Sequence, residues 1–337
     1  MRTLPEISFA HLYHLSDGIG LFEHAKLTEP RVAHGYCVDD VARGLIVAVR
    51  QPEPSQQLTL LAALYLRFVV AAQVEDGRIH NRRGAGGEWQ DEPTLEDCWG
   101  RALWGLGTAV SRAPGLAAQA LTQFEVSMTG RPSWPRAMAF AGLGAAEVLR
   151  VRPDHAGARA LLGDAAAQLG SVEVDANWPW PEPRLRYANA ALPEILLAAG
   201  SLLRDGNALA RGLDQLQWLL DLETSAGWLS VTPAGGWSPG EPRPGFDQQP
   251  IEVAALADAC ARAFDLTGED RWRKAVTACA EWFLGNNDAQ IALLDPLSGG
   301  GCDGLEVSGR NENQGAESTL AMIATFQQAR RLNSITR

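Results

Sequence analysis

Carboxylate, amide and aromatic side chains gather at six places along the chain, each where a helix rich in Ala, Gly and Leu is expected to begin. These helices are expected to start near Asp39, Asp97, Trp134, Tyr187, Gln249 and Gln314. Carboxylates and amides bind sugar hydroxyls, and indole faces pack on the apolar faces of pyranose rings. If the six helix starts meet in one cavity, these residue types point to carbohydrate chemistry.

Hydrolysis of a glycosidic bond needs two carboxyl groups, one to protonate the leaving oxygen and one to act as base or nucleophile. The helix starts supply several candidates: Asp39, Asp40, Glu96, Asp97, Glu182, Asp247, Glu252 and Glu317. We expect the catalytic pair to come from Asp40, Asp97, Asp247 and Glu317. The remaining carboxylates would then bind substrate or stabilise the fold.

Asp39 and Asp97 also have a structural interpretation. Each lies four residues before an arginine, Arg43 or Arg101, and this spacing permits an ion pair on one helix face. Carboxylates at helix starts are also favoured by the helix dipole. A carboxylic acid keeps its proton near neutral pH best in apolar surroundings without an adjacent cation. We therefore prefer Asp40 and Glu317 for the acid and base roles.

Other polar and aromatic residues of these segments are expected to bind substrate. They are Tyr36, Asp39, His80, Glu96, Trp99, Trp134, Trp180, Glu182, Tyr187, Asn189, Gln249, Asn313 and Gln314. The chain has 11 tryptophans. We expect Trp89, Trp99, Trp134, Trp178, Trp180, Trp228 and Trp237 at the end of the fold that carries the site, and Trp218, Trp272 and Trp282 in the core.

Two alternatives to hydrolysis stay open. A histidine in the cavity, His34 or His80, could move a proton at a sugar carbon, as an epimerase or isomerase requires. A non-catalytic glycan-binding module would need the aromatic and amide residues but no carboxylate pair. No histidine or cysteine pair has the spacing of metal ligands, so we expect neither a metal nor a cofactor. Cys37 and Cys98 are expected to be small buried residues.

The helices that position these residues alternate between two kinds. Amphipathic runs at 57–73, 115–128, 155–169, 206–222 and 269–285, with a first one at 7–24, suit an outer layer. The nearly apolar helices between them suit an inner layer packed on both sides. This repeat predicts an all-α (α/α)6 toroid with short strands near 227–233 and 291–294. The long loops at 76–94, 172–186, 225–248 and 287–313 all lead into inner helices and should therefore lie at one end. We expect residues 1–337 to form a single catalytic domain.

Composition restricts the partners. The chain has a net charge of −11, which argues against binding to a nucleic acid backbone. No apolar run reaches the ~18 residues of a membrane span. The five cysteines are odd in number and widely spaced, and the first residues lack the layout of a signal peptide, so we expect a cytoplasmic protein. The oligomeric state stays open.

Four segments carry a resemblance to a known group of proteins: Gly35–Arg43, Glu96–Trp104, Tyr187–Glu194, and Asp303–Leu305 followed by Asn311–Thr319. With the helix alternation, they resemble the six-hairpin glycosidase superfamily. More narrowly, they resemble an (α/α)6 domain of bacterial glycosyltransferase-associated or hypothetical proteins found near mannoside phosphorylases. The superfamily includes inverting glycoside hydrolases, phosphorylases and N-acylglucosamine 2-epimerases.

The resemblance implies a carbohydrate-active toroid and assigns no catalytic residue. We expect an inverting glycoside hydrolase acting on short oligosaccharides. Phosphorolysis stays open, because Arg43, Arg101 and Arg136 near the expected cavity could bind phosphate.

Overall fold

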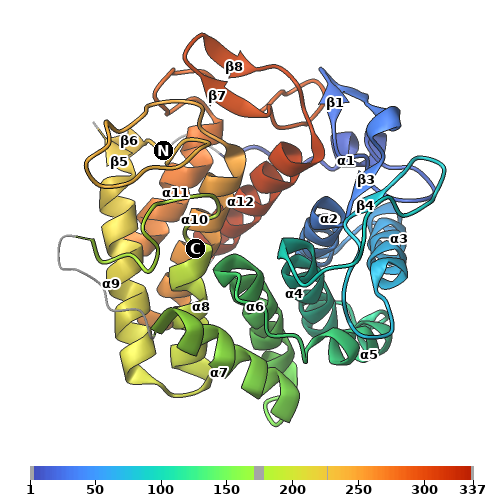
Figure 1. The fold of residues 1–337 in the computed structure, drawn as a ribbon. Coiled ribbons are helices and arrows are strands. Elements are labelled where there is room, and N and C mark those ends of the chain that lie inside the picture. Colours follow the sequence, from blue (N-terminus) through green and yellow to red (C-terminus); the bar gives the residue numbers. More distant parts are fainter. Residues whose placement is uncertain (1–3, 171–177, 226, 335–337) are drawn as a thin grey trace.

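The computed structural model describes residues 4–170, 178–225 and 227–334. Part of the predicted loop 172–186 lies outside these ranges. Within them, the predicted all-α fold is confirmed, because helices build two concentric layers and the strands are short (Figure 1). No helix among the described residues is both long and apolar enough to cross a membrane. That the whole chain is one catalytic domain stays a prediction.

Six helices form the inner layer. They are α2 (Val38–Arg50), α4 (Asp97–Arg112), α6 (Pro135–Val151), α8 (Ala191–Leu202), α10 (Pro250–Thr267) and α12 (Ala316–Ser334). Each packs against the next, and α12 packs back against α2, so the ring is closed. The outer layer contains α3 (Gln56–Ala72), α5 (Ala117–Ser127), α7 (Ala156–Gly170), α9 (Gly206–Leu222) and α11 (Asp270–Phe283).

The inner helices approach closely because glycines lie where they touch. A Cβ added at Gly107 of α4 would stand 2.1 Å from the carbonyl oxygen of Gly144 in α6, and one added at Gly144 would stand 2.2 Å from that of Leu103. A Cβ at Gly100 would likewise stand 2.3 Å from the carbonyl oxygen of Ala137. Helix α4 therefore packs on α6 backbone to backbone, which only residues without a side chain allow.

The first outer helix is much shorter than the predicted 7–24, because α1 covers only Ala10–His14. After it, Asp17 Oδ1 accepts hydrogen bonds from the backbone N–H groups of Ile19 and Gly20 at 2.8 and 3.0 Å. This Asx turn bends the chain out of the helix. The following residues, including Glu23, consequently run along the end of the barrel that carries the long loops.

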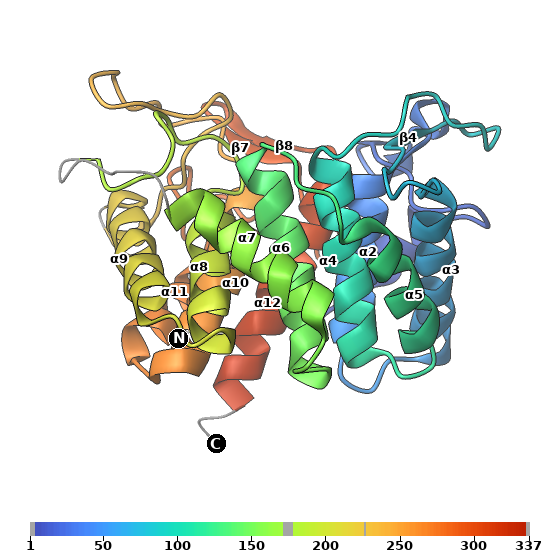
Figure 2. The ribbon, with the colours of Figure 1, turned by 60° about the horizontal axis from the view of Figure 1, so that its bottom comes forward.

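In the described part of the chain, four two-stranded antiparallel ribbons lie at that end (Figure 2). They pair β1 (Ala25–Lys26) with β2 (Glu29–Pro30), β3 (Tyr36–Cys37) with β4 (Arg82–Arg83), β5 (Thr224–Ser225) with β6 (Trp228–Leu229), and β7 (Gly304–Glu306) with β8 (Gly309–Asn311). A short 3₁₀ helix, η1 (Val32–His34), precedes β3. The predicted strand at 227–233 corresponds to β6, whereas 291–294 has only an isolated bridge from Leu294 to Gly301.

Candidate active site

A cavity of about 380 Å³ opens at the loop-bearing end, where the inner helices begin. The first turns of α2, α4 and α12 and the start of α10 contribute to its wall, and the segment before β1 completes it. A cavity of this size lies within the range of small-molecule sites. Of the residues predicted to be functional, Asp39, Asp40, Asp97, Tyr187, Gln249 and Glu317 line it.

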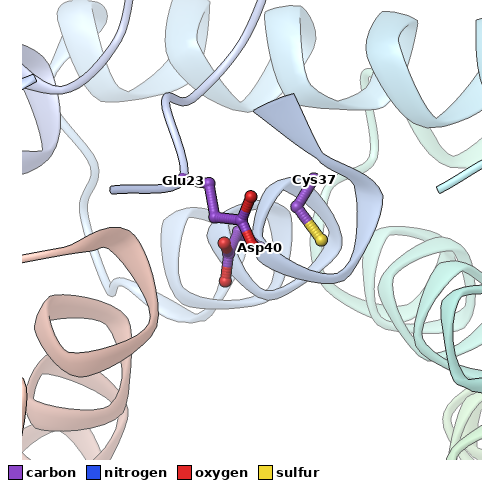
Figure 3. A group of neighbouring side chains, drawn as sticks. All are labelled: Glu23, Cys37 and Asp40. Atoms are coloured by element: carbon purple, nitrogen blue, oxygen red, sulfur yellow. The ribbon is translucent and has the colours of Figure 1, made fainter. Parts of the chain in front are cut away.

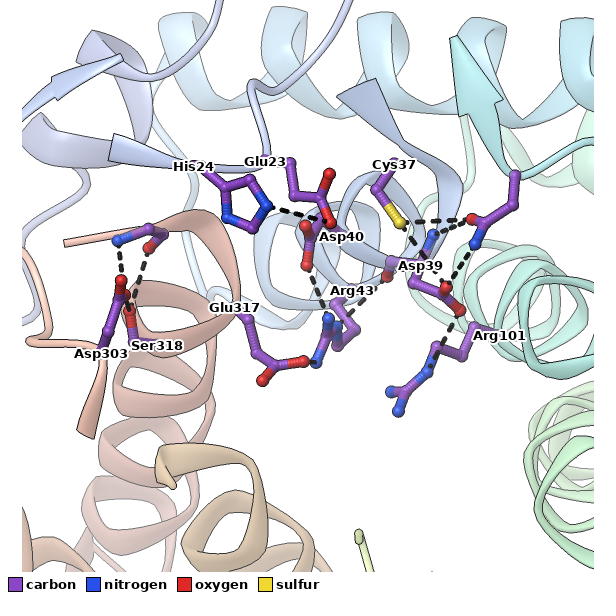
Figure 4. Close-up of polar contacts among 12 residues, drawn as sticks. Glu23, His24, Cys37, Asp39, Asp40, Arg43, Arg101, Asp303, Glu317 and Ser318 are labelled. Atoms are coloured by element: carbon purple, nitrogen blue, oxygen red, sulfur yellow. Dashed lines mark hydrogen bonds and ion pairs between the residues drawn. The ribbon is translucent and has the colours of Figure 1, made fainter. Parts of the chain in front are cut away.

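One guanidinium connects the two carboxyl groups that sequence reasoning preferred as acid and base. Arg43 donates from Nη2 to Asp40 Oδ1 at 2.6 Å and from Nη1 to Glu317 Oε2 at 2.8 Å (Figure 4). Its Nε donates to the backbone carbonyl of Asp39 at 3.2 Å, which fixes the orientation of the group. Asp40 and Glu317 come from α2 and α12, which the closure of the ring makes neighbours.

The two carboxyl groups differ in their affinity for a proton. Burial raises the pKa of Asp40 to about 7, and the nearby carboxylates of Glu317, Glu23 and Asp39 raise it as well. Arg43 acts to lower this pKa, but its effect is smaller than the others combined. Desolvation also acts to raise the pKa of Glu317, but the Arg43 guanidinium brings this pKa below its ordinary value. Asp40 is buried, whereas the Glu317 side chain is 42% exposed to the cavity. Opposite shifts of this kind separate an acid from a base.

The arginine partners differ from those that sequence spacing suggested. Arg43 pairs with Asp40, three residues before it, and not with the carboxylate of Asp39. Arg101 pairs with Asp39 of the neighbouring helix, Nε to Oδ1, at 3.4 Å. Asp40 and Glu317 thus both have an adjacent cation, contrary to the reason for which sequence reasoning preferred them. Within a helix the i,i+3 position is as accessible as i,i+4, and in a barrel the next helix is equally close.

Asp39 is held by a second set of contacts. Asn81 Nδ2, from the loop before β4, donates to Asp39 Oδ2 at 3.0 Å. The Cys37 thiol donates to Asn81 Oδ1 at 3.2 Å. The pairing of β3 with β4 brings this loop beside the start of α2. Asp39 Oδ1 is buried and accepts no hydrogen bond among the described residues. Its ion-pair partner is Arg101 Nε at 3.4 Å, so Asp39 is held in place in the cavity wall.

Asp97 has a different partner, Tyr187, whose hydroxyl donates to Asp97 Oδ2 across the cavity. Burial and the Asp97 charge raise the pKa of the Tyr187 phenol, so it remains a hydrogen-bond donor. The Arg136 guanidinium lies 4.8 Å from the centre of the tyrosine ring. Arg136 therefore supports the ring from behind, and Tyr187 presents its hydroxyl to Asp97.

Buried polar residues hold the backbone on either side of Tyr187. Glu252 accepts hydrogen bonds from the N–H groups of Ala188 and Asn189, at 3.2 Å for Asn189, and from Asn189 Nδ2 at 3.0 Å. Arg136 donates to both carboxylate oxygens of Glu182 at 2.7 and 2.8 Å. Asn189 and Glu182, predicted to bind substrate, do not line the cavity and instead position the residue that does.

Comparison with solved structures identifies the architecture. No family model matches the sequence, and no curated protein matches it. A sugar epimerase from a ruminal bacterium superposes with a TM-score of 0.74 at 10% identity, over 96% of this chain and 95% of that one. Cellobiose 2-epimerase from Spirochaeta thermophila gives 0.69 at 12% identity, over 97% and 93%. The GH76 α-mannanase of Bacteroides thetaiotaomicron gives 0.67 at 9% identity, over 97% and 94%.

The chain has the six-hairpin (α/α)6 toroid fold of these structures. The resemblance noted in the sequence is thus confirmed at the level of architecture. Identities near 10% leave the chemistry to be argued from the residues of this six-hairpin barrel itself.

Several predicted site residues of the six-hairpin barrel lie outside the cavity. Tyr36 is buried and donates to Asp17 Oδ2 at 2.7 Å, and its ring stacks on Phe22. His80 binds the carbonyl of Asp91 through Nδ1 at 2.7 Å and stacks on Trp89. Both side chains stabilise the loops around the cavity mouth, which explains why they occur beside the functional residues in sequence.

The predicted amides of the last junction also serve the loops. Asn313 Oδ1 accepts from the N–H of Leu27 at 2.9 Å, and Gln314 Nε2 donates to Asp295 Oδ2 at 2.8 Å. Neither residue lines the cavity, nor do Glu96 and Asp247, which are exposed. The side chains of Glu96 and Asp247 make no hydrogen bond in the part of the chain that the structure describes.

The tryptophans form the core and the loops, and none lines the cavity. Trp99 is fully buried and donates to the carbonyl of Ser127 at 3.1 Å. Trp180 is buried and stacks on Trp218, whereas Trp134 is 56% exposed at the start of α6. Trp272 and Trp282 are fully buried, as predicted. Burying a large indole in the core stabilises the folded protein more than exposing it in a cavity does. The number of tryptophans was therefore a poor guide to the site.

The cavity also contains residues that sequence reasoning missed. Glu23, His24, Asp303 and Ser318 line it (Figure 4), and so does Arg82. Glu23 and His24 lie in the stretch predicted as the end of an outer helix. Because α1 ends already at His14, these two residues instead reach the cavity, and recognising that early end would have identified them. Asp303 accepts from Ser318 Oγ at 2.6 Å and from the N–H of Gly315 at 2.8 Å. Arg43 and Arg101 had been noted, but only as ion-pair partners or phosphate ligands.

Glu23, Cys37 and Asp40 offer one possible metal-ligand atom each, all within 4.8 Å of one another (Figure 3). Metal binding would require the Cys37 thiolate. Burial and the charges of Asp39 and Asp40 raise the pKa of this thiol well above its ordinary value, and the thiol donates to Asn81. The group therefore suits a neutral thiol better than a metal ligand.

Proposed function

We propose that the protein is a carbohydrate-active enzyme, an inverting glycoside hydrolase of short oligosaccharides. The Arg43 bridge between Asp40 and Glu317, with their pKa values moved in opposite directions, carries this proposal. Asp40 would donate its proton to the glycosidic oxygen as the bond to the anomeric carbon breaks. Glu317 would take a proton from the water whose oxygen bonds to that carbon from the opposite face.

Other residues of the cavity would bind the sugar. Asp39 and Asp97 in the cavity wall offer carboxylates to sugar hydroxyls, and Tyr187 offers a ring. Gln249 adds an amide at the start of α10. Arg101, paired with Asp39, fixes the orientation of that carboxylate. The six-hairpin structures that resemble this chain include the GH76 α-mannanase, which supports a glycosidase.

The test is a screen of neutral oligosaccharides with and without phosphate, with products separated by chromatography and their anomers read by NMR. We expect hydrolysis without phosphate and release of the inverted anomer. Asp40→Asn and Glu317→Gln should each lower kcat by about 10²–10⁴-fold. Asp154→Asn, a matched change of an exposed aspartate before α7, should leave kcat unchanged. Phosphate-dependent cleavage, or full activity of either cavity variant, would contradict the proposal.

Epimerisation is the second candidate, because His24 lines the cavity and its Nε2 lies 3.6 Å from Glu23 Oε1. Neither His34 nor His80 lines the cavity, so the two histidines first considered are replaced by His24. The resemblance to epimerase structures supports this candidate. Incubation of reducing disaccharides in D₂O distinguishes the two reactions. An epimerase incorporates deuterium at the sugar carbon and loses this activity in His24→Gln, whereas a hydrolase incorporates none.

The same screen tests the remaining alternative, a glycan-binding module, which would bind oligosaccharides without any turnover. We also infer a cytoplasmic location, because all five cysteines are buried and unpaired. Free thiols are typical of reducing compartments. Fractionation of cells that express the full-length protein checks this location.

A further inference from the structure

A second, larger cavity of about 1270 Å³ lies at the opposite end of the barrel, where the inner helices finish. Arg50, Arg112 and Arg150 reach it from the last turns of α2, α4 and α6, and Arg331 reaches it from α12. Its lining contains seven arginines and five carboxylates, in a chain whose overall charge is −11. This end is therefore a local positive patch on an acidic protein.

Several arginines of this cavity form close ion pairs with carboxylates. Arg50 donates to both oxygens of Asp258 at 2.9 and 3.0 Å, and Arg331 donates to Asp265 at 2.8 Å. Arg262 reaches Glu194 Oε1 at 3.0 Å. These arginines have their carboxylates within hydrogen-bond distance and need no other partner.

Arg112 and Arg150 are different, because both depend on one carboxylate. Arg112 Nε lies 3.9 Å from Glu147 Oε2, and Arg150 Nη1 lies 3.5 Å from Glu147 Oε1. Neither guanidinium makes a hydrogen bond within the described residues. The hydrogen bond to Glu147 comes instead from Ser111 Oγ at 2.7 Å. Two guanidinium groups, with five N–H donors each, thus line the cavity without a hydrogen bond to an acceptor among the described residues.

The electrostatic surroundings agree with this excess of charge. Burial lowers the pKa of the Arg112 guanidinium, and the charges of Arg50, Arg150 and Arg331 lower it further, against the opposing effect of Glu147. The side chain is 35% exposed, so its donors are accessible from the cavity. An incoming anion would relieve the repulsion among these groups and supply the missing acceptors.

We propose that Arg112 and Arg150 bind the phosphoryl group of a small molecule, either inorganic phosphate or a sugar phosphate. A dianion matches two guanidinium groups that share a single carboxylate, and paired N–H donors match its oxygens. This site lies at the opposite end of the barrel from the catalytic cavity and is independent of the reaction proposed there. It would make the protein responsive to phosphate or to phosphorylated sugar.

The experiment is calorimetric titration of the full chain with inorganic phosphate, glucose 6-phosphate and glucose, at constant ionic strength set with NaCl. We expect saturable binding of both phosphoryl compounds and none of glucose. Affinity for glucose 6-phosphate above that for phosphate identifies a sugar phosphate as the ligand, and equal affinity identifies phosphate. Heats no larger than those of matched NaCl additions would overturn the proposal.

Variants place the site. Arg112→Gln and Arg150→Gln should each weaken phosphate binding at least ten-fold, and Arg67→Gln, a matched change of an exposed arginine on the outer helix α3, should not. Glu147→Gln should strengthen binding, because it removes the competing carboxylate. Unchanged affinity in both Arg112→Gln and Arg150→Gln would overturn the proposal and assign the phosphate to Arg43 or Arg101 in the other cavity.

Melting in phosphate-free buffer separates binding from a structural role. Arg112→Gln removes a charge from among like charges, so its Tm should equal or exceed that of the unchanged protein. Addition of phosphate should then raise the Tm of the unchanged protein but not that of the variant. A large loss of Tm in phosphate-free buffer, with phosphate binding retained in Arg150→Gln, would show that these arginines serve the fold.

Discussion

At the scale of single residues, Arg43 governs the chemistry proposed for the candidate cavity. It touches both carboxyl groups of the proposed pair, so its charge affects the acid and the base together. Because Asp40 is buried and Glu317 faces the cavity, the same cation leaves one carboxyl protonated near neutrality and the other ionised. A symmetric arrangement of the two carboxyls would not produce this difference.

The pH dependence of kcat/KM should follow from this pair. Activity needs ionised Glu317, whose pKa lies below the ordinary value, and protonated Asp40, whose pKa is about 7. We expect a bell-shaped profile that falls on the acidic side below about pH 4.5 and on the alkaline side near pH 7. Arg43→Gln should move both limbs to higher pH, because loss of the cation favours the protonated form of each carboxyl. A profile that is flat through pH 7 would contradict the role of Asp40.

Glu252 allows a test of stability at the same scale. Burial and the charge of Glu223 raise its pKa to about 8, against the backbone hydrogen bonds it accepts. Its folded-state pKa exceeds the unfolded value, so its stabilisation is complete below about pH 4.5 and is lost as the pH rises through 8. Glu252→Gln does not titrate.

The free energy of unfolding of this variant, relative to the unchanged protein, should therefore increase between pH 5 and 9. Urea denaturation at several pH values measures it. Glu252→Leu, which removes the acceptor for Ala188 and Asn189, should be about 1–3 kcal/mol less stable than Glu252→Gln at every pH, because neither side chain titrates. A constant difference between Glu252→Gln and the unchanged protein would contradict the raised pKa.

Sequence reasoning found the carboxylates of the cavity better than their partners. Asp39, Asp40, Asp97 and Glu317 are marked by type and by their place at helix starts, which periodicity can locate. Which arginine reaches which carboxylate depends on the neighbouring helix, as for Arg101 with Asp39, and no local spacing contains that information.

At the scale of elements, backbone contact between α4 and α6 is the tightest feature of the barrel. Gly144→Ala would place a Cβ 2.2 Å from the carbonyl oxygen of Leu103, where neither helix can move without disturbing the ring. We expect a loss of about 3 kcal/mol or more, at the upper end of overpacking effects. Urea denaturation measures it.

Gly163→Ala is the matched control on the outer helix α7. A Cβ there would meet only Leu203 Cδ1 at 3.7 Å, an ordinary contact. Because alanine is the better helix former, this change should stabilise the protein by about 0.5–1 kcal/mol. Equal effects of the two substitutions would show that the α4–α6 contact is looser than described.

The elements show where periodicity succeeds and where it fails. The alternation of amphipathic and apolar helices predicts the two layers, because burial on one side or both sides leaves a direct trace in the sequence. The prediction of a helix over 7–24 was wrong because the apolar residues of this segment continue after the helix ends. Leu15, Leu21 and Phe22 are buried, but they pack from turns stabilised by Asp17. Burial without helical hydrogen bonds leaves the same hydrophobic pattern.

At the scale of the whole molecule, the barrel has two chemically different ends. The inner helices all begin at the end that carries the loops, where carboxylates gather, and finish at the end where arginines gather. Each charge type lies where the helix dipoles favour it. Carboxylates therefore outnumber arginines in the cavity at one end of the ring, and arginines outnumber carboxylates in the cavity at the other end.

The excess of carboxylates in the candidate cavity should determine which sugars it binds. Its lining has six carboxylates, those of Glu23, Asp39, Asp40, Asp97, Asp303 and Glu317, against three guanidinium groups, those of Arg43, Arg82 and Arg101. Arg43 and Arg101 already pair with carboxylates of the cavity, and so does Arg82, with Glu23. A uronate would bring one more negative charge into this wall without a free cation to meet it, and like charges at such distances are costly.

We therefore expect neutral oligosaccharides to bind at least about ten-fold more tightly than analogues that differ only by a uronate carboxyl, a difference of ~1.4 kcal/mol. Competition assays with matched neutral and uronate sugars measure this ratio. The ratio should decrease only slightly between 50 mM and 500 mM NaCl, because charges within a cavity are screened less than those on a surface. Tighter binding of the uronate would mean that Arg82 or Arg101 exchanges its carboxylate partner for the substrate, and the cavity would then act on acidic sugars.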